Sequence, residues 1–382
     1  MAVDAGARGA DPGVAELAAE ADSFAAALAA EVADEPQLRW QGMPSDGDSR
    51  TAYAALGAAG WIGLHWPEQL GGRGLSPLHT VACEERFGYH WLPLSGYLLS
   101  VKTIGNALMR YAAPALQERL LPEVAAGRLV FCQGFSEPDA GSDLAALRTS
   151  ARADGDRFVV SGRKLWTSSA DVADWIYLAV RTGPQPRHRG LSVLVAPLDS
   201  PGIEVSAHAT LGGGTIGEVV LEDVEVRRDQ LVGTLDGGWT VLMGTLDHER
   251  VTSEKVGVVL WLLDRLDELA ATRADRARLL RLRGEAEAAR LHGRRAAALL
   301  GAGRPASEQS SMAKLAIAVL MQRLAAAAVE LLGPAALVEE GTTTLGGRIA
   351  AFHRAAVATT ISGGAAEVQR QVIARRGLAC PA

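Results

Sequence analysis

The chain has 382 residues, of which 48% are hydrophobic and 21% are charged, a balance that suits a globular protein. Its length exceeds one ordinary core, so two or three packed units are expected. The formal net charge is −6 and no basic block occurs, which argues against a nucleic-acid-binding surface.

Cysteine usage and hydropathy further narrow the class of protein to which the chain can belong. The cysteines Cys83, Cys132 and Cys380 lie far apart, so neither a disulfide framework nor a metal site is expected. The first residues lack the apolar run of a signal peptide. No apolar stretch reaches the roughly 18 uninterrupted residues of a spanning helix. These features predict a protein without a membrane segment, in a reducing cytoplasm.

The elements, in chain order, change character twice. Helical spacing marks 14–33, 80–86, 98–111 and 115–125, so residues 1–128 are predicted to form an α-helical N-terminal domain. Short β-branched runs separated by Gly, Asp and Pro follow, at 157–160, 175–181, 191–196, 203–207 and 218–226. No helix-length segment separates them, which predicts an antiparallel β domain over 129–236.

Helical spacing returns after residue 237, near 239–269, 275–300, 307–332 and 346–361. Four long helices in one segment predict a C-terminal four-helix bundle over 237–382. The fold class expected is therefore α+β, in the order helices, antiparallel sheet, helical bundle.

Two segments of the predicted β domain carry the most chemistry. They read FSEPDAGSDLAALRT at 135–149 and GRKLWTSS at 162–169, and they supply Ser136, Ser142, Ser168 and Trp166. Hydroxyls and backbone N–H groups bind the polar edge of a flat heterocycle, and an indole covers its apolar face. A flavin has this outline. The alternative is a Ser/Asp/Gly turn with Trp166 as an ordinary core residue.

At this spacing the two segments resemble the flavin-binding strands of the acyl-CoA dehydrogenase family, and the resemblance runs from about residue 15 to the C-terminus. It implies FAD as the cofactor, bound by Phe135, Ser136, Gly141 and Ser142 in the first segment. It also implies that Trp166 packs on the isoalloxazine. Two roles by analogy complete the set: Ser168 donates near flavin N5, and Ser142 also contacts the substrate or its pantetheine.

A second glycine pattern does not indicate a dinucleotide site. Gly212, Gly214 and Gly217 satisfy GxGxxG, but EVVLEDVEV follows them and alternates as a strand. A dinucleotide turn needs a helix N-terminus at that point, so a β-turn is predicted.

The family's reaction needs a base for the α-proton while a hydride passes from the β-carbon to flavin N5. In many members a glutamate in a motif like Y-E-G-T-S-Q-I-Q-R takes this proton. The matching stretch here, 361–370, reads ISGGAAEVQR and places Gly363 at the glutamate position. Gly363 has no side chain for the proton, but its N–H is expected to bind the thioester carbonyl. The neighbouring Gly364 is assigned to the flavin.

A second base position is known in the family, as in isovaleryl-CoA dehydrogenase-like and several actinobacterial members. The stretch GTLDHER at 244–250 matches its L-D-x-E-R pattern, with Glu249 as the base and Arg250 beside the substrate. Spacing supports this independently, because six positions fall on one helical face: Leu242, Leu246, Glu249, Ser253, Val256 and Leu260. An unpaired carboxylate on such a face is costly. A surface glutamate paired with a basic residue is the alternative. Asp247, His248 and Glu367 are weaker candidates for the base.

Motifs that complete the FAD site from a neighbouring subunit in this family are missing. The region of R-x-x-F-G reads ATRADRARLLRLRGEAEAARL, without Phe-Gly. The region of Q-x-x-G-G-x-G reads ELLGPAA at 330–336. The resemblance therefore leaves two assemblies open: the base-bearing chain of an α2β2 heterotetramer with a related chain, or a homo-oligomer.

The function expected is FAD-dependent α,β-dehydrogenation of an acyl thioester, with CoA as the expected carrier, a bulky or branched acyl group and a separate electron-transfer acceptor. Three alternatives remain. They are an acyl-carrier-protein-linked dehydrogenase of a biosynthetic pathway, a flavin monooxygenase on the same fold, and a non-catalytic partner subunit.

Overall fold

Helices form the first third of the chain. The structure, a computed structural model, describes residues 13–35, 43–44, 47–185, 187–339 and 344–380. All regular elements described before residue 128 are helical. They are α1 (Val14–Glu31), α2 (Arg50–Ala58), η3 (Glu68–Leu70), α3 (Pro77–Tyr89), α4 (Ser95–Tyr97), the π-helix η4 (Leu98–Gly105), α5 (Asn106–Tyr111) and α6 (Pro114–Ala125). Trp66, Phe87 and Tyr97 are the largest side chains buried among them.

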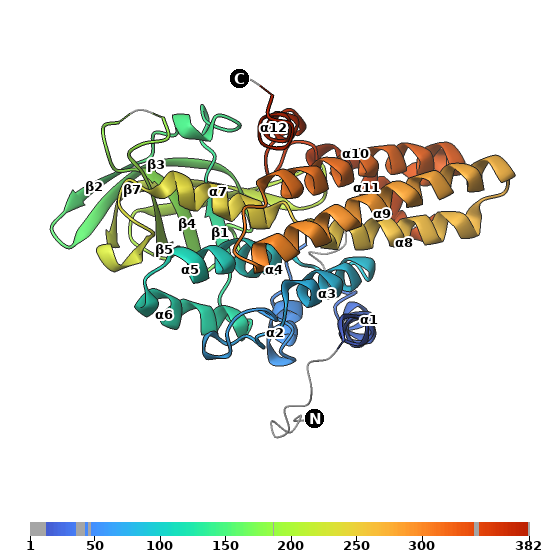
Figure 1. Cartoon of the computed structure of the whole chain (residues 1–382), viewed down its shortest axis with the longest axis horizontal. Helices are drawn as coiled ribbons and strands as arrows, with labels where there is room; N and C mark the ends of the chain where they lie inside the picture. Colours follow the sequence, from blue (N-terminus) through green and yellow to red (C-terminus); the bar gives the residue numbers. More distant parts are fainter. Residues whose placement is uncertain (1–12, 36–42, 45–46, 186, 340–343, 381–382) are drawn as a thin grey trace.

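An eight-stranded sheet follows, beside the N-terminal helices (Figure 1). Its strands are β1 (Phe131–Gly134), β2 (Ser150–Asp154), β3 (Arg157–Ser168), β4 (Trp175–Arg181), β5 (Leu191–Pro197), β6 (Ile203–Ala209), β7 (Thr215–Arg227) and β8 (Leu231–Val232). The order is β6-β7-β3-β2-β4-β5-β8, with β1 paired to β4.

The pairing is antiparallel as predicted, except around β4. Strand β1 runs parallel to β4, and β2 also meets β4 in parallel through Ser150 and Arg181. Parallel neighbours need a long connection, and here residues 135–174 supply it. That connection contains the predicted flavin segments and the β2–β3 hairpin.

The GxGxxG pattern forms the predicted turn between β6 and β7. The Thr210 N–H donates to Gly214 O at 2.8 Å, and the Gly213 N–H donates to Thr210 O at 3.1 Å. Strand β7 begins at the next residue, Thr215. A strand rather than a helix therefore follows these glycines.

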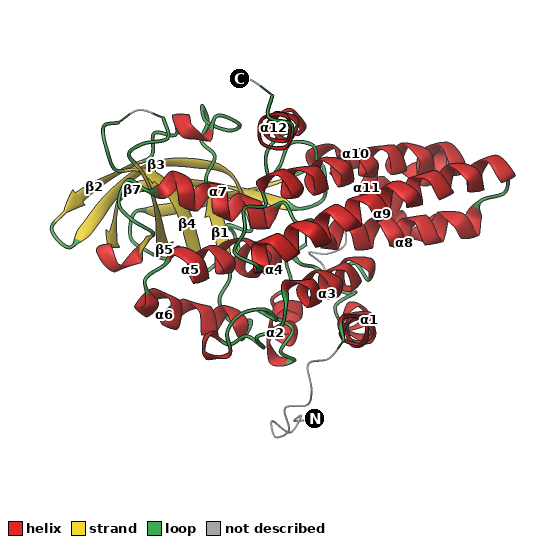
Figure 2. Ribbon diagram, in the orientation of Figure 1, coloured by secondary structure: helices red, strands yellow, loops and turns green. Residues whose placement is uncertain are grey.

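The last third of the chain is helical again. It contains α7 (Gly238–Glu249), α8 (Ser253–Leu269), α9 (Arg273–Gly301), α10 (Ser307–Leu332), η7 (Gly333–Leu337), η8 (Thr344–Gly347), α11 (Arg348–Ala358), α12 (Ala366–Val372) and the π-turn η9 (Ile373–Gly377). Helices α8 to α11 form the long bundle, while α7 lies beside the sheet (Figures 1 and 2). The predicted fold class is confirmed.

The prediction of a single helix over 239–269 is wrong, because two helices occupy this range. Helix α7 ends at Glu249, and α8 begins at Ser253. In the turn between them Val251 packs with Val81, Ala296 and Ala297. Two residues of this turn, Val251 and Thr252, are β-branched, which lowers their preference for a helix. The predicted apolar face is consequently divided between two helices, and Glu249 is the last residue of α7.

Helix α10 shows why composition alone is a weak guide to membrane insertion. The segment Ser307–Leu337 is long and apolar enough to cross a bilayer, with a mean hydropathy of 1.8. It nevertheless packs against α9, α11 and α12, and it buries Ile317, Met321 and Leu324 in the bundle core. Its apolar character matches its position inside the bundle.

Candidate active site

A cleft of about 720 Å³ lies where the three parts of the chain meet. The N-terminal helices line it with Ser95, Leu98, Leu99, Lys102 and Thr103; the sheet contributes Ser168 and the 210–216 turn; the C-terminal helices contribute Glu249, Glu254, Ile361 and Ser362. Most of the lining is apolar, and carboxylates are interspersed in it, which is typical of a ligand pocket.

Glu249 and Gly363 lie next to each other, although 113 residues of sequence separate them. A Cβ built on Gly363 would lie 3.0 Å from Glu249 Oε1. The carboxylate therefore occupies the space that a side chain at position 363 would use. Glu249 Oε2 is buried and has no hydrogen-bond partner among the described residues. An acceptor in this state is costly unless a ligand meets it.

Three side chains hold the Gly363–Gly364 turn against the end of α7. The Arg250 guanidinium donates through Nε to Gly363 O at 3.2 Å. Lys314 Nζ donates to Gly364 O at 2.8 Å, and Gln369 Nε2 donates to the same oxygen at 3.0 Å. Both glycines have positive φ, +66° and +97°, which glycine adopts without strain. The turn is thus fixed beside the Glu249 carboxylate.

Arg250 takes part in this clamp and also approaches Asp247 at 3.6 Å. Its side chain is buried, and burial lowers the pKa of the guanidinium while Asp247 and Glu249 oppose that shift. The predicted contact of Arg250 with substrate remains a prediction, since the guanidinium faces the C-terminal turn.

The two predicted flavin segments lie side by side. The Leu165 N–H of β3 donates to Ser136 O at 2.9 Å, and Lys164 Nζ donates to Phe135 O at 3.2 Å. Lys164 is fully buried and forms an ion pair with Glu137 at 2.8 Å. The Glu137 carboxylate also accepts from the N–H groups of Arg148 and Thr149, at 2.6 and 2.9 Å. One buried ion pair therefore ties both ends of the 135–149 loop to β3.

Only one of the residues predicted to bind flavin in the two segments lines the cleft, and the others lie outside its lining. Ser168 lines the cleft, while Phe135 is buried against Tyr177 with ring centroids 5.8 Å apart. Ser136, Gly141, Ser142 and Trp166 lie outside the cleft lining. Gly141 has open space where a Cβ would stand.

The exposed apolar side chains provide a test of whether a flavin fits. Trp166 is 67% exposed and sits at φ +60° beside an irregular step in the β3–β7 pairing. Ile361, which lines the cleft, is 66% exposed. Large apolar side chains this exposed mark a ligand or partner surface. Ile361 and Ser168 line the same cleft, so an apolar side chain and a hydroxyl are both available there for a flat ring with an apolar face and a polar edge.

Sequence reasoning missed a buried charge cluster beside the cleft. Lys102 of η4 forms ion pairs with Glu254 Oε2 at 2.6 Å and Glu84 Oε2 at 3.4 Å, and the Ser253 hydroxyl donates to Glu84. Burial raises the pKa of Glu84. The only signal for this cluster in the sequence was Lys102 itself, a charged residue in the otherwise uncharged first part of the predicted 98–111 helix.

A second missed group lies directly after Ser168. The Ser169 hydroxyl donates to Asp48 Oδ2 at 2.8 Å and meets the Ser95 hydroxyl at 2.5 Å. Ser169 has φ +60° and is 1% exposed. Asp48 lies outside every motif considered in the sequence, so no pattern pointed to it.

Comparison with known proteins decides the family. The models of the acyl-CoA dehydrogenase N-terminal, middle and C-terminal domains match residues 13–128, 132–224 and 236–378. The chain belongs to the acyl-CoA dehydrogenase family. Acyl-CoA dehydrogenase IpdE1 of Mycobacterium tuberculosis is 37% identical over 336 residues, covering 85% of this chain and 86% of the relative.

Solved structures agree with this assignment. The ChsE4–ChsE5 complex from Mycobacterium tuberculosis contains a chain with a TM-score of 0.86 and 30% identity, and the match covers 98% of this chain and 99% of that one. The Tcur3481–Tcur3483 steroid ACAD gives a TM-score of 0.86 at 29% identity, with 96% and 97% covered. The chain is therefore a flavoprotein oxidoreductase of this family, and family membership assigns FAD as its cofactor.

Proposed function

We propose that this acyl-CoA dehydrogenase removes the α-proton of a bulky acyl thioester with the carboxylate of Glu249. The observation that carries the proposal is the contact of Glu249 with Gly363: the carboxylate from α7 fills the space of the missing C-terminal side chain. Its buried Oε2 has no partner in the described residues and is free to accept a proton. The alternative of a surface glutamate paired with a basic residue has no support in these contacts.

The remaining residues orient the thioester. The Gly363 N–H, held by the clamp of Arg250, Lys314 and Gln369, is placed to donate to the carbonyl oxygen. A donor aimed at a developing enolate is worth roughly 3 kcal/mol. The bound FAD supplies the two-electron acceptor for the hydride of the β-carbon. Ser168 and Trp166 are proposed to hold its ring, and the apolar cleft excludes water.

The decisive experiment is anaerobic reduction of the bound flavin by a panel of acyl-CoAs, followed by its absorbance. Glu249→Gln is expected to slow this reduction by about 100-fold or more, because a positioned base contributes 10²–10⁴-fold. The matched control is Glu367→Gln. Its carboxylate lies in the same region but is 81% exposed and pairs with Arg370 at 3.6 Å.

The result separates the remaining alternatives. Reduction of the flavin by Glu249→Gln at the wild-type rate would contradict the assignment of the base. Reduction by NAD(P)H alone would favour a monooxygenase, and reduction only by acyl-carrier-protein thioesters would favour a biosynthetic enzyme. Failure of every thioester would favour a non-catalytic partner subunit.

We further propose that the chain works in a two-chain assembly, in the cytoplasm, and passes its electrons to a separate acceptor. The sequence lacks the two motifs that a neighbouring subunit contributes to FAD in this family. Two similar structures, ChsE4–ChsE5 and Tcur3481–Tcur3483, carry two chain names in their titles, which supports an α2β2 heterotetramer over a homo-oligomer.

A further inference from the structure

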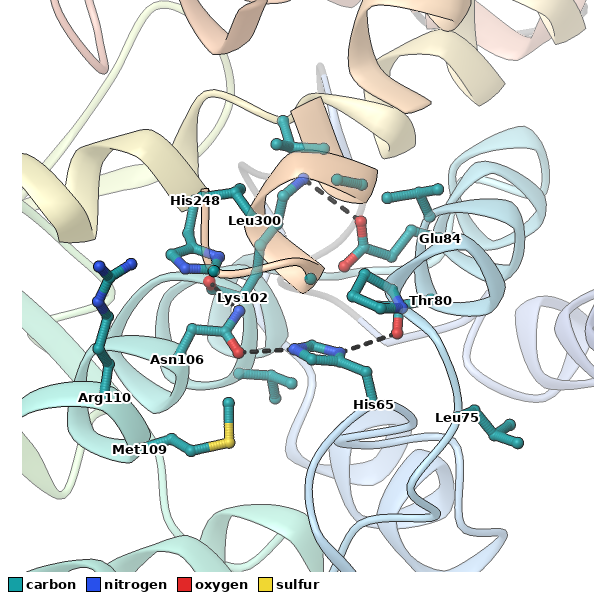
Figure 3. A pocket seen from close by; sticks show the side chains of 17 residues that line it. His65, Leu75, Thr80, Glu84, Lys102, Asn106, Met109, Arg110, His248 and Leu300 are labelled. Carbon is teal, nitrogen blue, oxygen red and sulfur yellow. Dashed lines mark hydrogen bonds and ion pairs between the residues drawn. The ribbon is translucent and has the colours of Figure 1, made fainter. Parts of the chain in front are cut away.

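A second cavity, of about 540 Å³, is drawn in Figure 3 and shares the lining residue Lys102 with the cleft. We call it the rear chamber. It is lined by the segment 65–75, α3, η4, α5, the end of α7 and the end of α9. Much of its wall is apolar, from Leu75, Val81, Val101, Met109, Val251 and Leu300, and polar side chains complete it.

Only a thin partition separates the rear chamber from the Glu249 cleft. Lys102 lines both cavities, with Glu84 on the chamber side and Glu254 on the cleft side. Consecutive residues at the end of α7 face the two spaces: Glu249 lines the cleft and His248 lines the chamber. Neighbouring residues point about 100° apart on a helix. An acyl group anchored at Glu249 therefore begins beside the chamber.

Part of the polar wall is already fully satisfied. Asn106 Oδ1 accepts from Trp66 Nε1 at 3.0 Å and meets His65 Nε2 at 2.8 Å. Because Asn106 contributes an acceptor, His65 Nε2 carries the proton, and His65 Nδ1 accepts from the Thr80 hydroxyl at 3.0 Å. The side chains of Asn106, His65 and Thr80 thus form a rigid wall, and His65 has no free donor.

The His248 ring is different. Within the described residues it makes no hydrogen bond, and it faces the chamber beside Arg110, Lys102 and Asn106 (Figure 3). Burial, the largest cause, together with the nearby cations Arg110 and Lys102, lowers its pKa to about 3. The neutral ring offers one donor and one acceptor. Arg110 adds an exposed guanidinium at the chamber wall. A purely hydrocarbon occupant would leave the His248 ring without a hydrogen-bond partner, which is costly.

We propose that the rear chamber receives the far end of the acyl group, and that this end is a bulky ring or branched skeleton bearing an oxygen function that hydrogen-bonds His248. The inference rests on the proposed dehydrogenation and adds its substrate class. The acyl chain would pass beside Lys102, whose ammonium stands at the junction of the two cavities.

The test measures equilibrium binding of three CoA thioesters to FAD-loaded protein in the Glu249→Gln background, where turnover does not consume them. The ligands are butyryl-CoA, a ring-bearing acyl-CoA, and the same ring-bearing acyl-CoA with a distal hydroxyl or ketone. Ala297→Phe fills the chamber from α9, and Leu300→Trp does so from a less buried position. Ala298→Phe, at an exposed position on the same helix, is the control.

Filling the chamber is expected to weaken binding of the ring-bearing ligands relative to butyryl-CoA by about tenfold or more, whereas Ala298→Phe leaves the ratio unchanged. His248→Leu is expected to reduce the preference for the oxygenated ligand about tenfold, the effect of one hydrogen bond, and His248→Gln is expected to keep part of it. Unchanged ratios in both filling variants, or an unchanged preference in His248→Leu, would overturn the inference. If no thioester reduces the flavin bound to the wild-type protein, the proposed dehydrogenation itself is refuted.

Discussion

At the scale of single residues, the main chemical feature is that Glu249 supplies the carboxylate while the other position known for the base, Gly363, has no side chain. The Glu249 carboxylate occupies the space beside Gly363, and it depends on the absence of a side chain there. The φ of +66° at Gly363 and the 3.0 Å approach of a built Cβ to Glu249 Oε1 show that any larger residue would meet both backbone strain and the carboxylate.

Gly363→Ala is therefore expected to slow flavin reduction and to lower the free energy of unfolding by about 1–2 kcal/mol, the cost of a left-handed alanine. Stopped-flow absorbance and thermal unfolding measure the two effects. Gly346→Ala is the control, because Gly346 has φ +60° with no atom within 4 Å of a built Cβ. Equal loss of rate in both variants would show that strain alone, without contact to Glu249, limits the reaction.

His248 is expected to make the stability of the folded protein sensitive to acid. Its pKa is lowered by burial from 6.5 to about 3 in the folded protein. The unfolded chain therefore binds the proton first as the pH falls below about 6.5, and the folded state loses stability between about pH 6.5 and 3. The slope contributed is at most about 1.4 kcal/mol per pH unit.

His248→Gln is expected to reduce this loss, measured as the difference in unfolding free energy between wild type and variant at pH 7 and pH 5. His208→Gln, at an exposed position on β6, is expected to change nothing. A His248→Gln protein that loses as much stability as wild type between these pH values would contradict a neutral buried imidazole.

At the scale of elements, the Glu137–Lys164 pair connects the flavin loop to β3. Burial opposes the charge on both groups, but Lys164 outweighs it for Glu137, whose pKa falls below its usual value. Lys164→Met leaves the Glu137 carboxylate buried without its counter-ion, which typically costs about 3–5 kcal/mol. Looser attachment of the 135–149 loop should also weaken FAD binding.

The measurements are FAD retained after gel filtration and the free energy of unfolding. Arg163→Met, one residue earlier on β3 at a side chain that is 54% exposed, is expected to cost less than about 1 kcal/mol. Glu137→Gln combined with Lys164→Met should recover part of the loss. Full FAD retention by Lys164→Met would show that the loop is held by other contacts.

The elements also show what the sequence could predict. Periodicity located the helical and β parts, and motif matching singled out Glu249 and Gly363 as the two positions that hold the base in this family. Periodicity did not detect the break at Arg250–Thr252, because the apolar spacing continues across it and the turn is stabilised by distant partners, Val81 and Gly363. The four-residue β1 was too short for a period, and its parallel pairing depends on a tertiary neighbour.

The Lys102 partition was unpredictable for a related reason. Its three charged members come from η4, α3 and α8, and 152 residues separate Lys102 from Glu254. Each residue alone resembles a solvated charge on a helix. Only the packing of the three helices shows that the charges are buried together between two cavities.

At the scale of the whole molecule, the exposed apolar residues indicate how the chain assembles. Leu280 and Leu291 of α9 are 71% and 64% exposed, and they lie eleven residues apart, three turns along one face. Val338 and Leu337, after α10, add further exposed apolar surface. Exposed apolar residues repeated on one helix face are typical of a protein interface, and the proposed two-chain assembly would use this face of α9.

We expect the chain expressed alone to hold less than one FAD per polypeptide, and co-expression with a second acyl-CoA dehydrogenase-family chain from the same genome to give a stable complex with FAD. Light scattering and flavin absorbance measure mass and stoichiometry. Leu280→Asp combined with Leu291→Asp should reduce complex formation because two charges would be buried at the interface, whereas Leu235→Asp, 47% exposed outside the bundle, should not. A homo-oligomer of the single chain with one FAD per polypeptide would show that no second chain is required.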